Sequence, residues 1–217
     1  MRGTIHTAKM KIGGIKVSNP RGYFPKLLAM DSETSGLSFN GYDPSYDVNK
    51  QRAYQAVSWG LVVVDSSTLK QIDELYVEIQ FDDKNIWNDK AEKIHGLSRE
   101  HLSVNGMTEL EAVETIGSFV FDHFGSENLV PCCGHNVSTF DIWFMRRLMD
   151  PYDVMFKTGN RFIDTNSIGF ACYNTYNSDD LFNLMDVKRE MHNSLEDAKA
   201  CVKVLYNTRK IYDSLIG

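Results

Sequence analysis

Two carboxylates stand one residue apart at the end of an apolar run, in the stretch LLAMDSETSGL. Side chains alternate between the faces of a β-strand, so Asp31 and Glu33 would point to the same side of a sheet, roughly 7 Å apart. Like charges held that close repel each other. A divalent cation would relieve the repulsion, because Mg²⁺ and Mn²⁺ prefer carboxylate oxygens. Two acids at this spacing also arise by chance, so a metal site needs further support.

A third acid stands at the start of an expected helix in GHNVSTFDIWF. Phe140, Phe144 and Leu148 repeat at four-residue intervals and would bury one helix face in the core, which places Asp141 in the first turn. The helix dipole favours a carboxylate there, so a purely structural role stays open.

A histidine and a fourth acid flank another helix start in HNSLEDAKACVKVL. Asn193 followed by Glu196 resembles a capping box, which places Asp197 in the first turn and His192 on the incoming loop. The spacing of His192 and Asp197 is weak evidence on its own, and its value comes from the other acids.

The elements that position these residues follow from the hydrophobic pattern. We expect strands at 27–33, 56–65 and 74–81, with a turn at Ser66 and Ser67, and therefore an antiparallel meander. Further on we expect helices at 88–96, 107–125, 138–150 and 194–215, strands at 128–136 and 161–165, and helical stretches after 165. The apolar face of the second helix would comprise Leu110, Val113, Ile116, Phe119 and Val120. This order predicts the α/β class, with a mixed five-stranded sheet flanked by helices.

The composition indicates one globular domain. The chain has 217 residues, of which 42% are hydrophobic, and its four cysteines show no zinc or disulfide spacing. No apolar run approaches the roughly 18 residues of a membrane span, and no secretory signal is evident. We therefore expect a cytoplasmic protein that does not bind membranes.

The charge is unevenly distributed. The net charge is −6, yet none of the 29 acidic residues precedes Asp31, whereas six of the 23 basic residues do. The basic segment 1–26 could be an electrostatic arm for nucleic acid or a solvated lead-in to the domain. The low overall charge does not exclude a phosphate-bearing substrate, because metal ions reverse the sign of an acidic site.

Together the motifs resemble those of a known enzyme family. The three stretches, in order, are Asp31-x-Glu33, Gly134-His135-Asn136 through Phe140-Asp141, and His192-x4-Asp197. They resemble the exonuclease motifs of the DEDDh-type 3′-to-5′ exonucleases, which have a ribonuclease H-like fold and include proofreading subunits, oligoribonuclease and ribonuclease T. The resemblance runs from about Leu27 to Leu215, and it predicts an exonuclease domain over 27–217.

The resemblance implies the catalytic roles. Asp31, Glu33, Asp141 and Asp197 would bind two divalent ions, Mg²⁺ or Mn²⁺, and His192 would be the general base. Two such ions can hold a phosphodiester between them, and a histidine can take the proton of the attacking water near neutral pH.

The resemblance also suggests residues that bind substrate. Thr34, Gly36 and Leu37 would contact the 3′-terminal nucleotide, although Leu37 could equally be a core residue. His95, in IHGLSREHL, would lie on a substrate-side loop or be a surface residue. Asn136 would position the terminal nucleotide or cap the following helix.

Two further residues and one loop receive more ordinary roles. Phe140 is expected in the core, and Asp164 is expected to cap the helix that follows it rather than to bind metal. The long polar loop from Ser38 to Gln55 could be functional or a flexible decoration. Its tyrosines could stack on bases and its basic residues touch phosphate; they are Tyr42, Tyr46, Tyr54, Lys50 and Arg52.

The sequence thus predicts a metal-dependent 3′-to-5′ exonuclease acting on single-stranded DNA. Short RNA is the alternative substrate, because discrimination depends on contacts to the 2′ hydroxyl. A nucleic-acid-binding module that has lost catalysis is the second hypothesis, and a structural domain with merely solvated acids is the weakest. A polymerase or replication partner is compatible with the resemblance, and the sequence does not define the oligomeric state.

Overall fold

The computed structural model describes residues 10–12, 15–17, 24–36, 54–125, 129–189 and 192–216. Its main feature is a five-stranded sheet in the order β5-β4-β3-β6-β7. The strands are β3 (Lys26–Thr34), β4 (Ala56–Asp65), β5 (Gln71–Glu78), β6 (Cys132–Gly134) and β7 (Ile163–Asp164). The first three are antiparallel neighbours, whereas β6 is parallel to β3 and β7 is parallel to β6. The predicted mixed sheet is confirmed.

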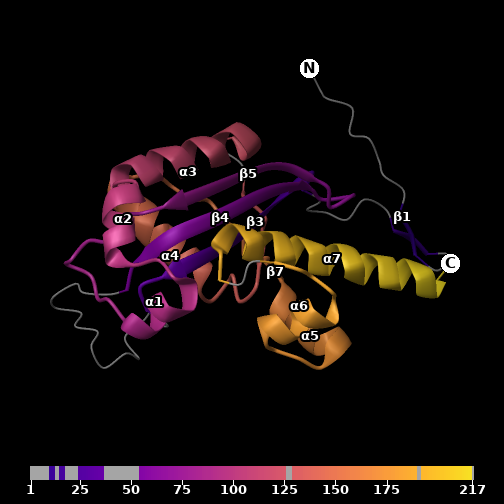
Figure 1. Cartoon of the computed structure of the whole chain (residues 1–217). Helices are drawn as coiled ribbons and strands as arrows, with labels where there is room; N and C mark the ends of the chain where they lie inside the picture. The colour runs from indigo at the N-terminus through magenta and orange to yellow at the C-terminus, as the bar shows by residue number, and fades with distance from the viewer. Residues whose placement is uncertain are drawn as a thin grey trace, which may run out of the picture.

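Helices cover both faces of the sheet (Figure 1). The helices are α1 (Asp89–His95), α2 (Arg99–Asn105), α3 (Glu109–Phe124), α4 (Asp141–Met149), α5 (Thr165–Tyr173), α6 (Ser178–Leu184) and α7 (Ser194–Ile216), with a 3-10 turn η2 (Asp150–Tyr152). No helix among these described residues is both long and apolar enough to cross a membrane. All four cysteines fall in the described part of the chain, and none of them forms a disulfide.

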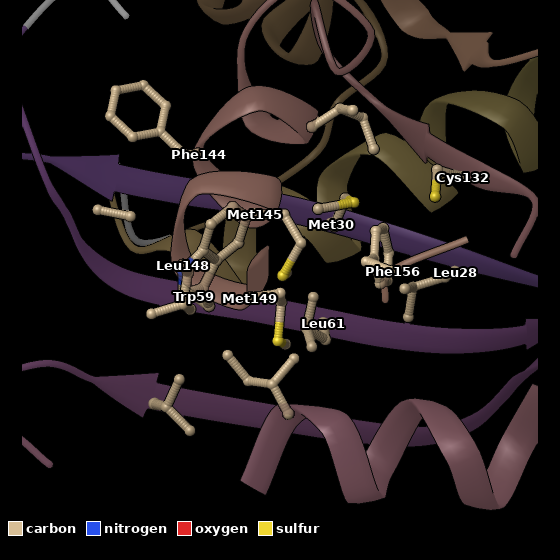
Figure 2. Packing of buried hydrophobic residues seen from close by; sticks show 14 of the residues in the cluster. Leu28, Met30, Trp59, Leu61, Cys132, Phe144, Met145, Leu148, Met149 and Phe156 are labelled. Atoms are coloured by element: carbon tan, nitrogen blue, oxygen red, sulfur yellow. The ribbon is translucent and has the colours of Figure 1, made fainter. Parts of the chain in front are cut away.

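The alternation of side chains along β3 creates two separate cores. Leu28 and Met30 pack with residues of α3 and α4, and Figure 2 shows Met30 beside Met145 in this cluster. Leu27 and Ala29 point to the other face and pack with α6 and α7. Strand periodicity therefore directs the next odd-numbered residues of β3, the predicted metal ligands, toward the α7 face.

Several details differ from the predictions. Strand β5 begins at Gln71 rather than Glu74, because the turn after β4 closes within Asp65–Lys70 and the polar residues after it already pair with β4. Helix α2 was not predicted. Leu110 is 49% exposed and so does not belong to the buried face of α3, although Val113 and Ile116 do.

The expected basic extension contains structure of its own. Within residues 1–26 the chain forms a small antiparallel pair, β1 (Met10–Ile12) and β2 (Ile15–Val17), which is a sheet separate from the main one. The basic arm and the domain boundary at 27 stay predictions.

Candidate active site

The end of β3 carries the first two acids. Asp31 pairs in register with Gly60 of β4, and Glu33 pairs with Ser58. Both acids face α7, whereas Ser32 between them is buried and faces the α4 side. The predicted common face of Asp31 and Glu33 therefore points toward the helix that carries Asp197.

Helix α7 approaches this end of the sheet unusually closely. A Cβ at Gly60 would lie 2.2 Å from the backbone of Ser194 and Leu195, so only glycine permits the approach. The hydroxyls of Ser58 and Ser194, both fully buried, hydrogen-bond at 3.0 Å. These two contacts fix the start of α7 against β4, and sequence reasoning did not identify either of them.

The start of α7 holds His192 and Asp197 beside Glu33. Asn193 caps the helix as predicted, because its Oδ1 accepts hydrogen bonds from the amides of Leu195 and Glu196. One ligand atom each from Glu33, His192 and Asp197 lies within 4.8 Å of the others. The backbone of His192 adopts a left-handed conformation with φ of 59°.

Asp141 reaches the site from the opposite face of the sheet. It is the first residue of α4 and is only 2% exposed. The Ser32 hydroxyl donates a hydrogen bond of 2.7 Å to Asp141 Oδ1. Burial raises the pKa of Asp141 to about 7, although the Ser32 hydrogen bond acts in the opposite direction. Asp31 and Asp141 do not belong to the group formed by Glu33, His192 and Asp197, but their charges interact with Glu33.

The four carboxyls perturb one another. Burial raises the pKa of Glu33 to about 8, with contributions from the charges of Asp197 and Asp141. Burial and the charges of Asp141, Asp197 and Glu33 raise the pKa of Asp31 well above its usual value. Burial also raises the pKa of Asp197 to about 6, against the lowering effect of Arg189.

This donor set fits a hard divalent cation. Several carboxylates removed from water and repelling one another are unfavourable unless they are protonated or share a cation. Oxygen ligands of this type suit Mg²⁺ and Mn²⁺, and the adjacent imidazole of His192 is suited to proton transfer.

Two of the predicted substrate contacts, Thr34 and His95, lie at the end of β3. Thr34 is buried, and its hydroxyl donates to the Gly36 carbonyl at 2.6 Å. His95, the last residue of α1, accepts a hydrogen bond from the Leu97 amide at Nδ1, so Nε2 carries the proton of the neutral ring. Burial lowers the pKa of His95, whereas the charge of Glu92 and a hydrogen bond with the Thr34 backbone act in the opposite direction.

Asn136 belongs to the turn before α4. Its side chain is exposed, its φ is 60°, and its carbonyl accepts hydrogen bonds from the Thr139 and Phe140 amides. The backbone N–H of Asn136 donates a hydrogen bond to the Asp164 carboxylate. This carboxylate also accepts a hydrogen bond from the backbone N–H of Asn166 and so caps α5, as predicted. Phe140 packs against the core, also as predicted.

The prediction that Tyr54 stacks on bases is wrong. Tyr54 is only 5% exposed and packs on Gly36, where a Cβ would lie 2.0 Å from the ring. Its ring thus shapes the end of β3 from inside the protein. Leu37 and the predicted loop residues Tyr42, Tyr46, Lys50 and Arg52 lie outside the described residues.

Arg189 is the charged residue that sequence reasoning missed. Its guanidinium forms ion pairs with Asp197 of α7 and Asp179 of α6, and its side chain is 6% exposed. It also lies over the Phe182 ring, 4.7 Å from the centroid. The dipeptide Lys188-Arg189 in a loop looks like a solvated feature, so the sequence contained no signal for this role.

Solved structures of exonucleases share this fold. The crystal structure of E. coli exonuclease I in complex with a dT13 oligonucleotide has 16% identity and a TM-score of 0.67; the match covers 88% of this chain and 43% of that one. Exonuclease I from Methylocaldum szegediense has 18% identity and a TM-score of 0.66, over 88% of this chain and 42% of the other. The nuclease domain of 3′hExo, a DEDDh family member bound to rAMP, has 10% identity and a TM-score of 0.66, over 87% and 94%.

At these identities the likeness is one of fold. The chain shares the fold of exonuclease I and of the 3′hExo nuclease domain, and the predicted ribonuclease H-like fold is confirmed. It spans less than half the length of exonuclease I but nearly the whole 3′hExo nuclease domain. One E. coli exonuclease I complex with single-stranded DNA is a zinc-bound form. No protein-family model matches the chain, and no curated protein matches it.

Proposed function

We propose that this protein is a metal-dependent 3′-to-5′ exonuclease that hydrolyses single-stranded DNA. The observation that supports this most is the convergence of Glu33, His192 and Asp197 within 4.8 Å at the end of β3. Asp31 on the same strand face and Asp141 from α4 complete the acidic set. The fold shared with exonuclease I and 3′hExo supports the same reaction class.

The residues divide into binding and proton transfer. Asp31, Glu33, Asp141 and Asp197 would hold two divalent ions. When bound, these ions would lower the pKa of an attacking water and stabilise the departing 3′ oxygen. His192 would accept the proton of that water at a ring nitrogen, because histidine is the side chain that most often acts as a general base. Ser32 keeps Asp141 oriented, and the contacts of Gly60 and Ser58 hold the start of α7 in place.

Substrate binding would occur around the end of β3. We assign contacts to the 3′-terminal nucleotide to Thr34, Gly36, Leu37 and His95, with Asn136 on the adjacent turn. A hydrogen bond with the Thr34 backbone acts on the His95 ring, so His95 lies at the end of β3, where it is suited to meet a substrate oxygen. Short RNA is the alternative substrate, and 3′hExo bound to rAMP gives that alternative a structural parallel.

A degradation assay tests the proposal. The full chain is incubated with 5′-labelled single-stranded DNA or RNA of equal sequence, with Mg²⁺, Mn²⁺ or chelator. We expect stepwise shortening from the 3′ end that requires metal, is faster on DNA, and is lost in Asp31→Asn. Asp213→Asn, which changes an exposed acid on α7, is the matched control and should keep full activity. Binding without shortening would favour a nucleic-acid-binding module and contradict the proposal.

The remaining assignments concern the chain as a whole. We propose that 27–217 forms the exonuclease domain and that the basic segment 1–26 contacts the nucleic-acid backbone. Deleting residues 1–25 should then weaken DNA binding at low salt and reduce the salt dependence of the affinity. Unchanged affinity would mean that the segment does not contact nucleic acid. A cytoplasmic location and a polymerase or replication partner stay predictions.

A further inference from the structure

A buried cation lies in direct contact with the proposed metal site. Arg189 pairs with Asp197, one of the four acids, and its side chain is 6% exposed. Its charge lowers the pKa of Asp31, Glu33 and Asp197, in each case against larger effects that raise it. Arg189 therefore acts electrostatically on several of the acids, not on Asp197 alone.

Arg189 is held in this position by contacts outside the site. Asp179 of α6 binds its second guanidinium nitrogen, and the Phe182 ring lies against its plane. The chain leading to it is also fixed, because the Val187 amide donates to the Phe182 carbonyl and Asn207 of α7 donates to the Met185 carbonyl. These contacts oppose a simple withdrawal of the guanidinium from Asp197.

A guanidinium and a divalent ion would both need the Asp197 carboxylate. Arginine stays protonated at any physiological pH, so Arg189 cannot relieve a conflict by losing its charge. Two positive charges that share one carboxylate in a partly buried site repel appreciably, because little water screens them. Part of the attraction of the acids for metal is thus offset by a cation that belongs to the protein.

We propose that Arg189 competes with the divalent ion for Asp197 and thereby sets a weaker metal affinity than the four acids alone would give. This inference rests on the proposed function, because it assumes that Asp197 is a metal ligand. It assigns to Arg189 a regulatory role over metal loading rather than a step in the reaction.

The test is a direct Mn²⁺ titration of the full chain, in which electron paramagnetic resonance measures the free ion. Arg189→Met removes the charge but keeps an apolar contact with the Phe182 ring. We expect it to bind Mn²⁺ at least tenfold more tightly than the wild type. Arg189→Lys keeps the charge and should bind within about threefold of the wild type. A tenfold change corresponds to about 1.4 kcal/mol.

Arg209→Met is the matched control. Arg209 lies on α7 and donates to the Ser66 and Ser67 carbonyls, away from the acids, so its loss should leave Mn²⁺ affinity unchanged. Equal or weaker Mn²⁺ binding by Arg189→Met would overturn the inference, because it would mean that Arg189 only ties α6 to α7 or orients Asp197.

A second variant covers the case in which Arg189→Met does not fold. Arg189→Gln removes the charge but keeps a side-chain donor for Asp179 and Asp197, so Mn²⁺ binding should again be tighter than in the wild type; equal or weaker binding would overturn the inference. Failure of the proposed function is recognised separately. A wild type that neither binds Mn²⁺ nor degrades DNA overturns both ideas, whereas an active wild type with no gain in Arg189→Met overturns only this one.

Discussion

Gly60→Ala tests whether the close approach of α7 to β4 positions the active site. The added Cβ would lie 2.2 Å from the Ser194 carbonyl carbon and oxygen and from the Leu195 nitrogen, whereas ordinary contacts begin at 3.4 Å. These are backbone atoms, so the clash cannot be relieved by turning a side chain. The start of α7 must therefore move by about 1 Å, more than the roughly 0.5 Å tolerated by a catalytic constellation.

The expected effects follow from that displacement. Asp197 lies in the first turn of α7 and His192 lies two residues before the helix, so both move relative to Glu33. A misplacement of about 1 Å can lower a rate by about 10²-fold. Overpacking should lower stability by about 1–3 kcal/mol. We expect a folded Gly60→Ala protein with weakened Mn²⁺ binding and a rate on labelled DNA reduced by about 10²-fold.

Gly106→Ala separates this effect from a general loss of stability. A Cβ at Gly106 would lie 2.6 Å from the Leu102 carbonyl oxygen and 2.7 Å from the Gln80 nitrogen, a comparable clash at the end of α2. This variant should lose stability, measured by thermal unfolding, but keep its Mn²⁺ affinity. Wild-type Mn²⁺ affinity and rate in folded Gly60→Ala would refute the proposed positioning role of the helix approach.

Three further predictions concern individual groups of the site. In chelator, the melting temperature should fall as the pH rises from 5 to 8. Glu33 has a pKa of about 8 in the folded protein and an ordinary value of 4.5, so the native state binds more protons than the unfolded state in this range. Each such group contributes about 1.4 kcal/mol per pH unit; Mn²⁺ should remove the trend, and a flat profile in chelator would contradict the prediction. His192→Ala should keep Mn²⁺ binding but lose about 10²–10⁴-fold in turnover, and full activity would exclude His192 as the base. Ser32→Ala removes a hydrogen bond to Asp141 and should cost about 1.5–3 kcal/mol in urea unfolding, unlike Ser214→Ala at the exposed end of α7.

Much of the fold could be predicted because its signals are local. The apolar run of β4 and the glycine after His95 mark their elements directly, and Gly96 indeed ends α1 with φ of 75°. The period of two along β3 was enough to place Asp31 and Glu33 on one face. Helix α2 was missed because Leu102 is its one buried residue and so it has no repeating apolar pattern, although Ser98 caps it and was a usable signal.

Several residues of the site could not be predicted because they contact residues that are distant in the sequence. Gly60 looked like an ordinary residue inside a buried strand, and only the path of α7 shows why a side chain cannot fit there. Ser32 faces the opposite side from its neighbouring acids, so its hydrogen bond to Asp141 required knowledge of where α4 lies. Arg189 precedes α7 whereas Asp197 lies within it, so no single helical or strand period relates the two residues.

The most direct test of the account is a crystal structure of the protein grown with Mn²⁺, with the ions located by anomalous scattering. We predict manganese bound by carboxylate oxygens of Asp31, Glu33, Asp141 and Asp197 at about 2.1 Å, with His192 adjacent. Manganese at other residues, or none at saturating Mn²⁺, would contradict the claim that these four acids form one metal site.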